Sequence, residues 1–327
     1  MTARFVSDNT PKGLTIIVLF SSNIRRYRAA FVMWFLLVAA ACTSASIGEQ
    51  SATTPPAQTW TTVCGENDSW DKPGPPFQVF GNTYYVGTCG IASILITGDQ
   101  GHVLIDGGTE RGGELVEANI TALGFDINDV AILLHSHEHY DHVGGLAYLQ
   151  ARSGGRVIAS VRAAPVLRSG IVADDDPQAR MHEPFPGVVV AATVSDGEPV
   201  KLGALTLTAI ETPGHSPGAL SWTWASCESE QCRYIAYLDS LSPVSRNNYR
   251  FSDDPDYLAA YRASLTTLVD IRCDVVLTPH PVASDMHRRL SEPTGLLDQA
   301  GCRNYVDRIE RRLERRVSEE RESALTR

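Results

Sequence analysis

The chain of 327 residues is 43% hydrophobic and 20% charged, which excludes disorder over most of its length and leaves room for one large domain or two small ones. Residues 1–41 hold five of the 28 basic residues but only one of the 38 acidic residues, so the remainder carries 23 basic against 37 acidic side chains, a net charge of −14. That acidity argues against nucleic acid as a partner, because phosphate binding needs clustered lysine and arginine.

The N-terminal residues 1–42 have the pattern of a targeting segment. Three arginines at 25, 26 and 28 precede the apolar run Ala29–Ala41, which has secretory length and is too short to span a bilayer comfortably. Three outcomes fit this pattern: cleavage and release, acylation of Cys42 as a lipid anchor, or an uncleaved membrane anchor. We therefore expect an exported, periplasmic protein.

A small, polar and proline-containing stretch follows at 43–60 and predicts a flexible tether. The folded domain is expected to begin near Trp60 and to run over 61–327. Its first half alternates strands and helices. Helical spacing of Leu115, Ile120 and Leu123 predicts a helix that ends at Gly124. β-Branched and apolar runs predict strands at 83–98, 102–108, 130–137 and 156–161, with a further helix at 144–154.

The second half repeats the alternation. Strands are predicted at 205–216, 219–226, 233–240 and 274–281, and an amphipathic helix at 256–271. In the closing stretch 303–320, apolar residues recur at steps of three and four and predict a surface helix with a charged outer face: Val306, Ile309, Leu313 and Val317. Alternating strands and helices imply an α/β fold in which helices cover sheets.

Three of the expected strands end in a turn that bears histidine: LLHSHEHYDHVGG (Leu133–Gly145), ETPGHSPG (Glu211–Gly218) and VVLTPHP (Val275–Pro281). In open α/β folds, strand ends are where loops converge to form sites. On an extended segment the spacing of His137 and His139 aims both imidazoles the same way; Asp141 continues that register and His142 leaves it. The turns therefore predict six ligands for two metal ions: His137, His139, Asp141, His142, His215 and His280.

Zinc suits imidazoles with one carboxylate and no thiolate. Two zinc ions close together can share a hydroxide, because metal binding lowers the pKa of water from about 15.7 to about 7. The cluster is thus expected to generate a nucleophile at neutral pH.

Other side chains near these motifs receive ordinary roles. His135 is expected to pack or to support a ligand, and Glu138 and Tyr140 should point away from the metals because they alternate with the ligands. His102, His182 and His287 are expected to be solvent-exposed or hydrogen-bonded in a core.

Apart from Cys42, six cysteines make an even set, which suits disulfides in an oxidising compartment: Cys64, Cys89, Cys227, Cys232, Cys273 and Cys302. Spacing alone leaves their pairing open, although a local bond between Cys227 and Cys232 is the simplest. Metal binding by these cysteines is disfavoured, because none shows C-x-x-C spacing.

The motif SHEHYDH, followed in order by TPGHSPG and TPHP, resembles the signature of the metallo-β-lactamase superfamily, and the resemblance runs from about Cys64 to Cys302. It implies the αβ/βα four-layer sandwich, in which two central mixed sheets face each other with helices outside. YYVGTCGIASILITGDQGHVLIDGG, GHSPGALSWTW and DSLS resemble subclass B3, and the loop SCESEQC resembles its AIM-type (Adelaide imipenemase) members.

The resemblance also implies roles for individual residues. The first zinc would take His137, His139 and His215, and the second Asp141, His142 and His280. Ser240, in the place where other branches have a cysteine ligand, and Ser242 would hold the carboxylate of a β-lactam, directly or through water. The implied disulfides join Cys64 to Cys89, Cys227 to Cys232 and Cys273 to Cys302.

The implied reaction is hydrolysis of the β-lactam ring of penicillins, cephalosporins and carbapenems, with Asp141 both binding metal and orienting the nucleophile. The expected enzyme is a monomer that needs no protein partner. Two rivals are an exported lactonase, or another hydrolase on the same scaffold, and a non-catalytic zinc-binding protein. Asp239 decides between the substrates: many members that cleave other substrates bridge both metals with an aspartate near this place, so an Asp239 that faces the metals would weaken the β-lactam interpretation.

Overall fold

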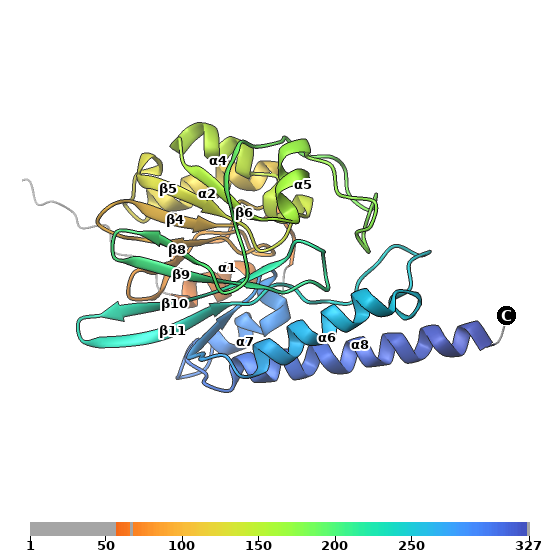
Figure 1. The fold of residues 1–327 in the computed structure, drawn as a ribbon. Helices are drawn as coiled ribbons and strands as arrows, with labels where there is room; N and C mark the ends of the chain where they lie inside the picture. The colour runs from red at the N-terminus through yellow and green to blue at the C-terminus, as the bar shows by residue number, and fades with distance from the viewer. Residues whose placement is uncertain (1–56, 66–67, 326–327) are drawn as a thin grey trace, which may run out of the picture. The chain divides into compact units, whose positions relative to one another are not determined.

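The computed structural model describes residues 57–65 and 68–325 (Figure 1). The expected targeting segment, Cys42 and most of the expected tether lie outside these residues. Helix α1 (Ala57–Cys64) begins inside the stretch predicted as tether. The reason is Trp60, which is only 2% exposed and packs edge-on against Phe77 and Tyr85, with ring centroids 6.5 and 5.8 Å away. The domain therefore starts a few residues earlier than the composition predicts.

Two β-sheets form the centre of the domain. The seven-stranded sheet has the order β1 to β7, with bounds Phe77–Phe80, Thr83–Tyr85, Ile94–Ile96, His102–Ile105, Val130–Leu134, Arg156–Ser160 and Val190–Val194. The five-stranded sheet has the order β12-β11-β10-β9-β8, and in chain order its bounds are Pro199–Leu202, Leu205–Glu211, Leu220–Glu228, Gln231–Tyr237 and Val275–Leu277. Strands β4 to β7 pair in parallel, as do β11 and β12, and the remaining pairs are antiparallel.

Helices cover the outer face of each sheet (Figure 1). Helices α2, α4 and α5 pack on the seven-stranded sheet, and α6 and α8 pack on the five-stranded sheet. In chain order the helices after α1 are α2 Glu110–Ala122, α3 Tyr140–Val143, α4 Leu146–Ser153, α5 Ala163–Ser169, α6 Pro255–Val269, α7 Met286–Leu290 and α8 Gly301–Leu325. Short 3₁₀ turns lie at Ile127–Asp129, Phe251–Asp253 and Pro281–Ser284.

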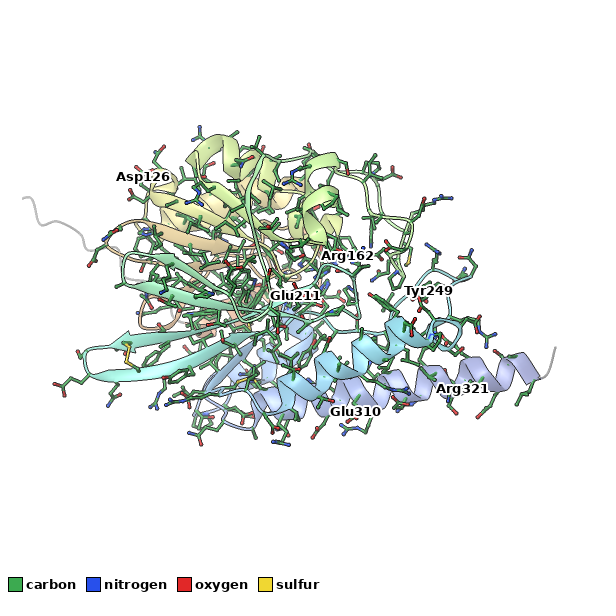
Figure 2. All side chains as sticks on the ribbon, viewed as in Figure 1. Asp126, Arg162, Glu211, Tyr249, Glu310 and Arg321 are labelled. Atoms are coloured by element: carbon green, nitrogen blue, oxygen red, sulfur yellow. A yellow bond between two sulfur atoms is a disulfide. The ribbon has the colours of Figure 1, made fainter. Side chains whose placement is uncertain are left out.

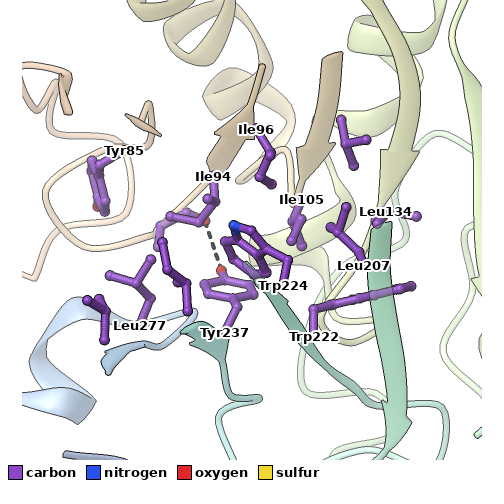
Figure 3. Packing of buried hydrophobic residues seen from close by; sticks show 14 of the residues in the cluster. Tyr85, Ile94, Ile96, Ile105, Leu134, Leu207, Trp222, Trp224, Tyr237 and Leu277 are labelled. Carbon is purple, nitrogen blue, oxygen red and sulfur yellow. Dashed lines mark hydrogen bonds between the residues drawn. The ribbon is translucent and has the colours of Figure 1, made fainter. Parts of the chain in front are cut away.

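The inner faces of the two sheets meet in a core that contains several large aromatic side chains (Figure 3). Along β3, Ile94 and Ile96 face this core while Leu95 faces the outer helices, as the period of two in a strand requires. Trp222 and Tyr237 are fully buried between the sheets. The predicted four-layer αβ/βα sandwich is therefore confirmed.

The structure divides one predicted strand into two and contains the predicted C-terminal helix. The run 83–98, predicted as one strand, forms the antiparallel pair β2 and β3, because Gly87 and Gly90 sit where a Cβ would collide with backbone atoms and the chain turns there. In α8 all four apolar positions that predicted the helix are buried, and they pack against α6.

Candidate metal centre

Side chains from three strand ends meet at one edge of the sandwich. The turn after β5 in the seven-stranded sheet and the turns after β9 and β12 in the five-stranded sheet bring together His137, His139, Asp141, His142, His215 and His280. The centre therefore spans the junction of the two sheets.

Three imidazoles form the first group. The ring centroids of His137, His139 and His215 lie 4.7 to 5.0 Å apart, and one nitrogen from each lies within 4.8 Å of the others. His137 Nε2 is buried and has no hydrogen-bond partner within 57–65 and 68–325. Three ring nitrogens are thus placed to hold one metal ion.

The second group is a close triangle of ligand atoms. Asp141 Oδ2 lies 3.2 Å from His142 Nε2 and 3.3 Å from His280 Nε2, and the two nitrogens are 3.3 Å apart. Zinc ligands about 2.0 Å from a tetrahedral metal are about 3.3 Å from one another, so the triangle has the dimensions of one face of such a site. His137 also groups with Asp141 and His142, and its ring lies 4.2 Å from that of His142, so the two groups are adjacent.

Comparisons with known proteins agree with this geometry. The sequence profile of the Metallo-beta-lactamase superfamily matches residues 86–227. The solved structure of the MIM-2 metallo-beta-lactamase is 55% identical, with a TM-score of 0.78, and the match covers 82% of this chain and 99% of that one. The chain belongs to the metallo-β-lactamase superfamily.

Other members of the superfamily are similar to different extents. MIM-1 from Novosphingobium pentaromativorans is 47% identical (TM-score 0.79; 82% and 99% of the two chains), and MEM-A1, a subclass B3 enzyme from a soil metagenome library, is 40% identical (TM-score 0.75; 78% and 100%). A hydroxyacylglutathione hydrolase of Bradyrhizobium sp. (strain ORS 278) is 34% identical over 105 residues, 32% of each chain. The matched region thus spans only about a third of that curated relative's length.

Carboxylates lie near the Nδ1 atoms of two histidines of the centre, His137 and His142. Asp239 Oδ1 lies 2.8 Å from His137 Nδ1, which leaves Nε2 of that ring for a metal. Asp106 Oδ2 lies 3.6 Å from His142 Nδ1, beyond hydrogen-bond distance, and accepts hydrogen bonds from Tyr237 and Ser136, both at 2.7 Å. Such partners fix the tautomer and the orientation of a metal-binding histidine.

His215 is oriented from behind by the segment that carries Ser242. Its Nδ1 lies 2.9 Å from the Ser242 carbonyl oxygen and 3.1 Å from the Ser242 hydroxyl. Ser240 Oγ is buried and has no hydrogen-bond partner in the described part of the chain. The structure thus places Ser242 against a histidine of the first group and buries the Ser240 hydroxyl.

The environment of the centre favours the neutral, metal-binding form of two imidazoles of the first group, His137 and His215, whereas the pKa of His139 is raised because its contact with Asp176 outweighs burial. Burial lowers the pKa of His137 well below its usual value, and the neighbouring His142 and His139 lower it further. Burial alone would also lower the pKa of His142, but the carboxylates of Asp141 and Asp106 raise it to about 10. The donor set of five imidazoles and one carboxylate, with no thiolate, fits zinc.

Glu138 has a role that the sequence interpretation missed. It points away from the ligands, as expected, but it accepts hydrogen bonds from Ser216 Oγ and from the Gly218 backbone N–H, both at 2.7 Å. Burial and the nearby Asp176 raise its pKa to about 7, although the bond from Ser216 opposes that rise. Glu138 therefore ties the turn after β5 to the turn that carries His215.

His182 belongs to neither ligand group but lies at the border of the centre. Its half-buried ring lies 6.0 Å from that of His139 and 5.8 Å from that of Trp70, whose ring is 6.5 Å from His280. His182 borders the centre because the loop 170–185 folds back onto it, a contact that carries no local sequence signal. His135 does pack: it is fully buried, and its Nε2 accepts the Ser160 N–H at 3.1 Å.

No cysteine of the described residues belongs to either group. The structure joins Cys64 to Cys89, Cys227 to Cys232 and Cys273 to Cys302, the pairs that the resemblance implies. The second of these closes the β10–β11 hairpin.

Proposed function

We propose that this protein hydrolyses the β-lactam ring of antibiotics, including carbapenems, with two zinc ions. The observation that supports this most strongly is the match to MIM-2, because it covers 99% of a solved metallo-beta-lactamase at 55% identity. The two adjacent ligand groups supply the chemistry that such a match requires.

His137, His139 and His215 would hold the first zinc, and Asp141, His142 and His280 the second. Zinc ions bound there would polarise the lactam carbonyl and lower the pKa of a water molecule to about 7. The chain's own residues position these parts. Asp141 is buried at the junction of the groups, where its second carboxylate oxygen can orient the attacking water.

Substrate binding would fall to side chains at the border of the centre. We place the β-lactam carboxylate at Ser240 and Ser242, as the resemblance implies. Trp70 and the half-buried His182 offer flat rings near His280 and His139, where they would exclude water from the bound ring of the substrate.

Asp239 supports the β-lactam proposal over the thioesterase alternative. Its Oδ1 pairs with Nδ1 of His137, and its Oδ2 lies 3.3 Å from the Leu241 backbone N–H. Oδ2 accepts the backbone N–H, and Oδ1 contacts the imidazole without forming a hydrogen bond, so the carboxylate lies on the Nδ1 side of His137, away from the ring nitrogen that would bind metal.

The proposed setting is the periplasm, with the protein acting as a monomer. Three disulfides suit an oxidising compartment. Within the described residues, no helix has the length and apolar character to cross a membrane. Cell fractionation with mass determination of the mature N-terminus would distinguish release from acylation of Cys42, and light scattering would give the oligomeric state.

Turnover of imipenem by purified protein, with and without a chelator, tests the proposal. We expect hydrolysis that the chelator abolishes and zinc restores, and loss of at least 100-fold in His139→Ala. His287→Ala, on α7 and outside both groups, is the matched control and should keep full activity.

Competing substrates separate the alternatives in the same assay. Nitrocefin should be cleaved, whereas an acyl-homoserine lactone and a glutathione thioester should not. Efficient turnover of either of the latter, with none of imipenem or nitrocefin, would replace the proposal by a lactonase or thioesterase. Bound zinc without any turnover would favour a non-catalytic zinc protein.

A further inference from the structure

A loop far from the ligands in sequence reaches the first metal group. Asp176 Oδ2 lies 3.1 Å from His139 Nε2, and both side chains are at most 2% exposed. Because a carboxylate only accepts, the imidazole donates from Nε2 and keeps Nδ1 as its bare nitrogen. The bond therefore selects which nitrogen of His139 can bind metal.

The same loop contacts a second histidine of that group. Gln178 Nε2 lies 3.2 Å from His215 Nε2, and the Gln178 backbone N–H donates to Asp176 Oδ1 at 2.6 Å. Asp176 thus has a separate partner for each carboxylate oxygen. The segment 176–178 lies against two of the three imidazoles that would hold the first zinc.

Arg246, in the loop that follows β11, holds this loop in place. Its side chain donates to the backbone oxygens of Asp174 and Asp176 at 3.3 and 3.2 Å, and its backbone N–H donates to Pro177 O at 2.9 Å. The guanidinium also lies 5.7 Å from the ring centroid of Tyr249, which is labelled in Figure 2. Arg246 contacts the loop without contacting any ligand.

Of the three consecutive aspartates at 174–176, Asp176 is the one that contacts a histidine of the metal centre. Asp174 and Asp175 are exposed and pair with Arg180 and Arg162 at the surface. Asp176 is buried, and burying a carboxylate is costly unless it is hydrogen-bonded or paired. The contact with His139 therefore accounts for the burial of Asp176.

We infer that Asp176 is a positioning residue that sets the tautomer and orientation of His139 for the first metal, and that Arg246 holds Asp176 in that position. This inference rests on the proposed metal centre. A carboxylate behind a metal-bound histidine raises the basicity of the ring, and loss of such a partner typically costs about 10- to 100-fold in metal affinity or activity. The loop bordering the site is thereby part of the metal centre.

Asp176→Ala and Asp176→Asn test the inference against Asp175→Asn as the matched control on the neighbouring exposed acid. The two donors meet different oxygens of Asp176, so in an asparagine either the Gln178 N–H or His139 Nε2–H would face the amide NH2, which is itself a donor. The measurements are zinc affinity by chelator competition, zinc stoichiometry, the visible spectrum of the cobalt-substituted protein, and the melting temperature of the metal-free protein.

We expect zinc at one of the two sites to bind 10- to 100-fold more weakly in Asp176→Ala, with an altered cobalt spectrum and little change in metal-free melting. Asp176→Asn should lie between this variant and wild type, and Asp175→Asn should match wild type. Arg246→Ala should weaken the same site by a smaller factor, although it removes no atom near a ligand.

Wild-type zinc affinity and cobalt spectrum in both Asp176 variants would overturn the inference while the proposed function stands. Should Asp176→Ala not fold, Asp176→Asn decides alone, because it keeps the shape of the side chain. A wild-type protein that binds no zinc would instead remove the proposed function, and this inference with it.

Discussion

Glu138, which lies in sequence between the ligands His137 and His139, connects two turns of the metal centre. Its carboxylate crosses from the seven-stranded sheet to the turn after β9, where Gly218 lies so close that a Cβ there would be 2.7 Å from Glu138 Oε1. Any side chain at Gly218 would therefore displace the bridge. The two turns are aligned by one buried acid.

Glu138→Ala should destabilise the metal-free protein by about 2 kcal/mol or more, because it leaves two buried donors without an acceptor. Glu138→Gln should cost less, since the amide keeps one acceptor oxygen. Denaturant unfolding measures both, with Glu310→Ala on the exposed face of α8 as the control. Equal stability of Glu138→Ala and the control would refute the bridging role.

At the scale of elements, α7 holds the end of β12 near His280. Buried Arg289 donates to the backbone oxygens of Val276 and Leu296 at 2.9 and 2.8 Å, so it joins α7 to that strand and to the loop beyond. Its neighbour Arg288 is exposed, and among the described residues its ion pairs are with Asp285 and Glu292.

These adjacent arginines make a matched pair. Arg289→Met should lower the free energy of unfolding by about 3 kcal/mol, because buried carbonyls lose charged donors. Arg288→Ala should change it by less than about 1 kcal/mol, as is usual for exposed ion pairs. Urea unfolding at one pH compares them, and similar losses in the two variants would contradict the assignment.

The disulfides differ in the chain length that they close. Cys273–Cys302 spans 29 residues and joins the β12 region to α8, whereas Cys227–Cys232 spans five within one hairpin. On chain-entropy grounds, replacing the first pair by serine should cost about 3.5 kcal/mol and replacing the second about 2 kcal/mol. Thermal or denaturant unfolding of the two double variants checks this order, and a larger loss from the hairpin pair would reverse it.

At the scale of the molecule, the centre joins the two sheets. The first group combines two histidines that follow β5 with His215 after β9, and the second combines Asp141 and His142 with His280 after β12. Each zinc would therefore cross-link the two halves of the sandwich.

Removing zinc should lower the stability of the whole domain as well as abolish activity. Ligand that binds only the folded state contributes about 4 kcal/mol when its free concentration is about 1,000 times Kd. We expect calorimetry to show a melting temperature that falls in chelator and rises again with added zinc. In His215→Ala the zinc-dependent rise in melting temperature should be smaller. That variant loses the ligand by which the first group is joined to the five-stranded sheet. A melting temperature independent of zinc in wild type would contradict the cross-link.

The elements and the ligand types follow from local pattern. The alternation in HEHYDH, the apolar run of β5 and the helical spacing in α8 each depend on residues close in the chain, where strand and helix periods decide which side chains share a face. That is why the residues at the centre could be named before their positions in space were known.

The tertiary structure decided which distant side chains support them. Nothing local distinguishes Asp176 from Asp174 and Asp175, or assigns His182 to the border of the centre; burial and contact across more than 30 residues do so. Asp239 likewise acquires its role from the approach of two sheets, which brings it 2.8 Å from His137. Such contacts depend on how the layers pack, and packing is a property of the whole chain that no short stretch encodes.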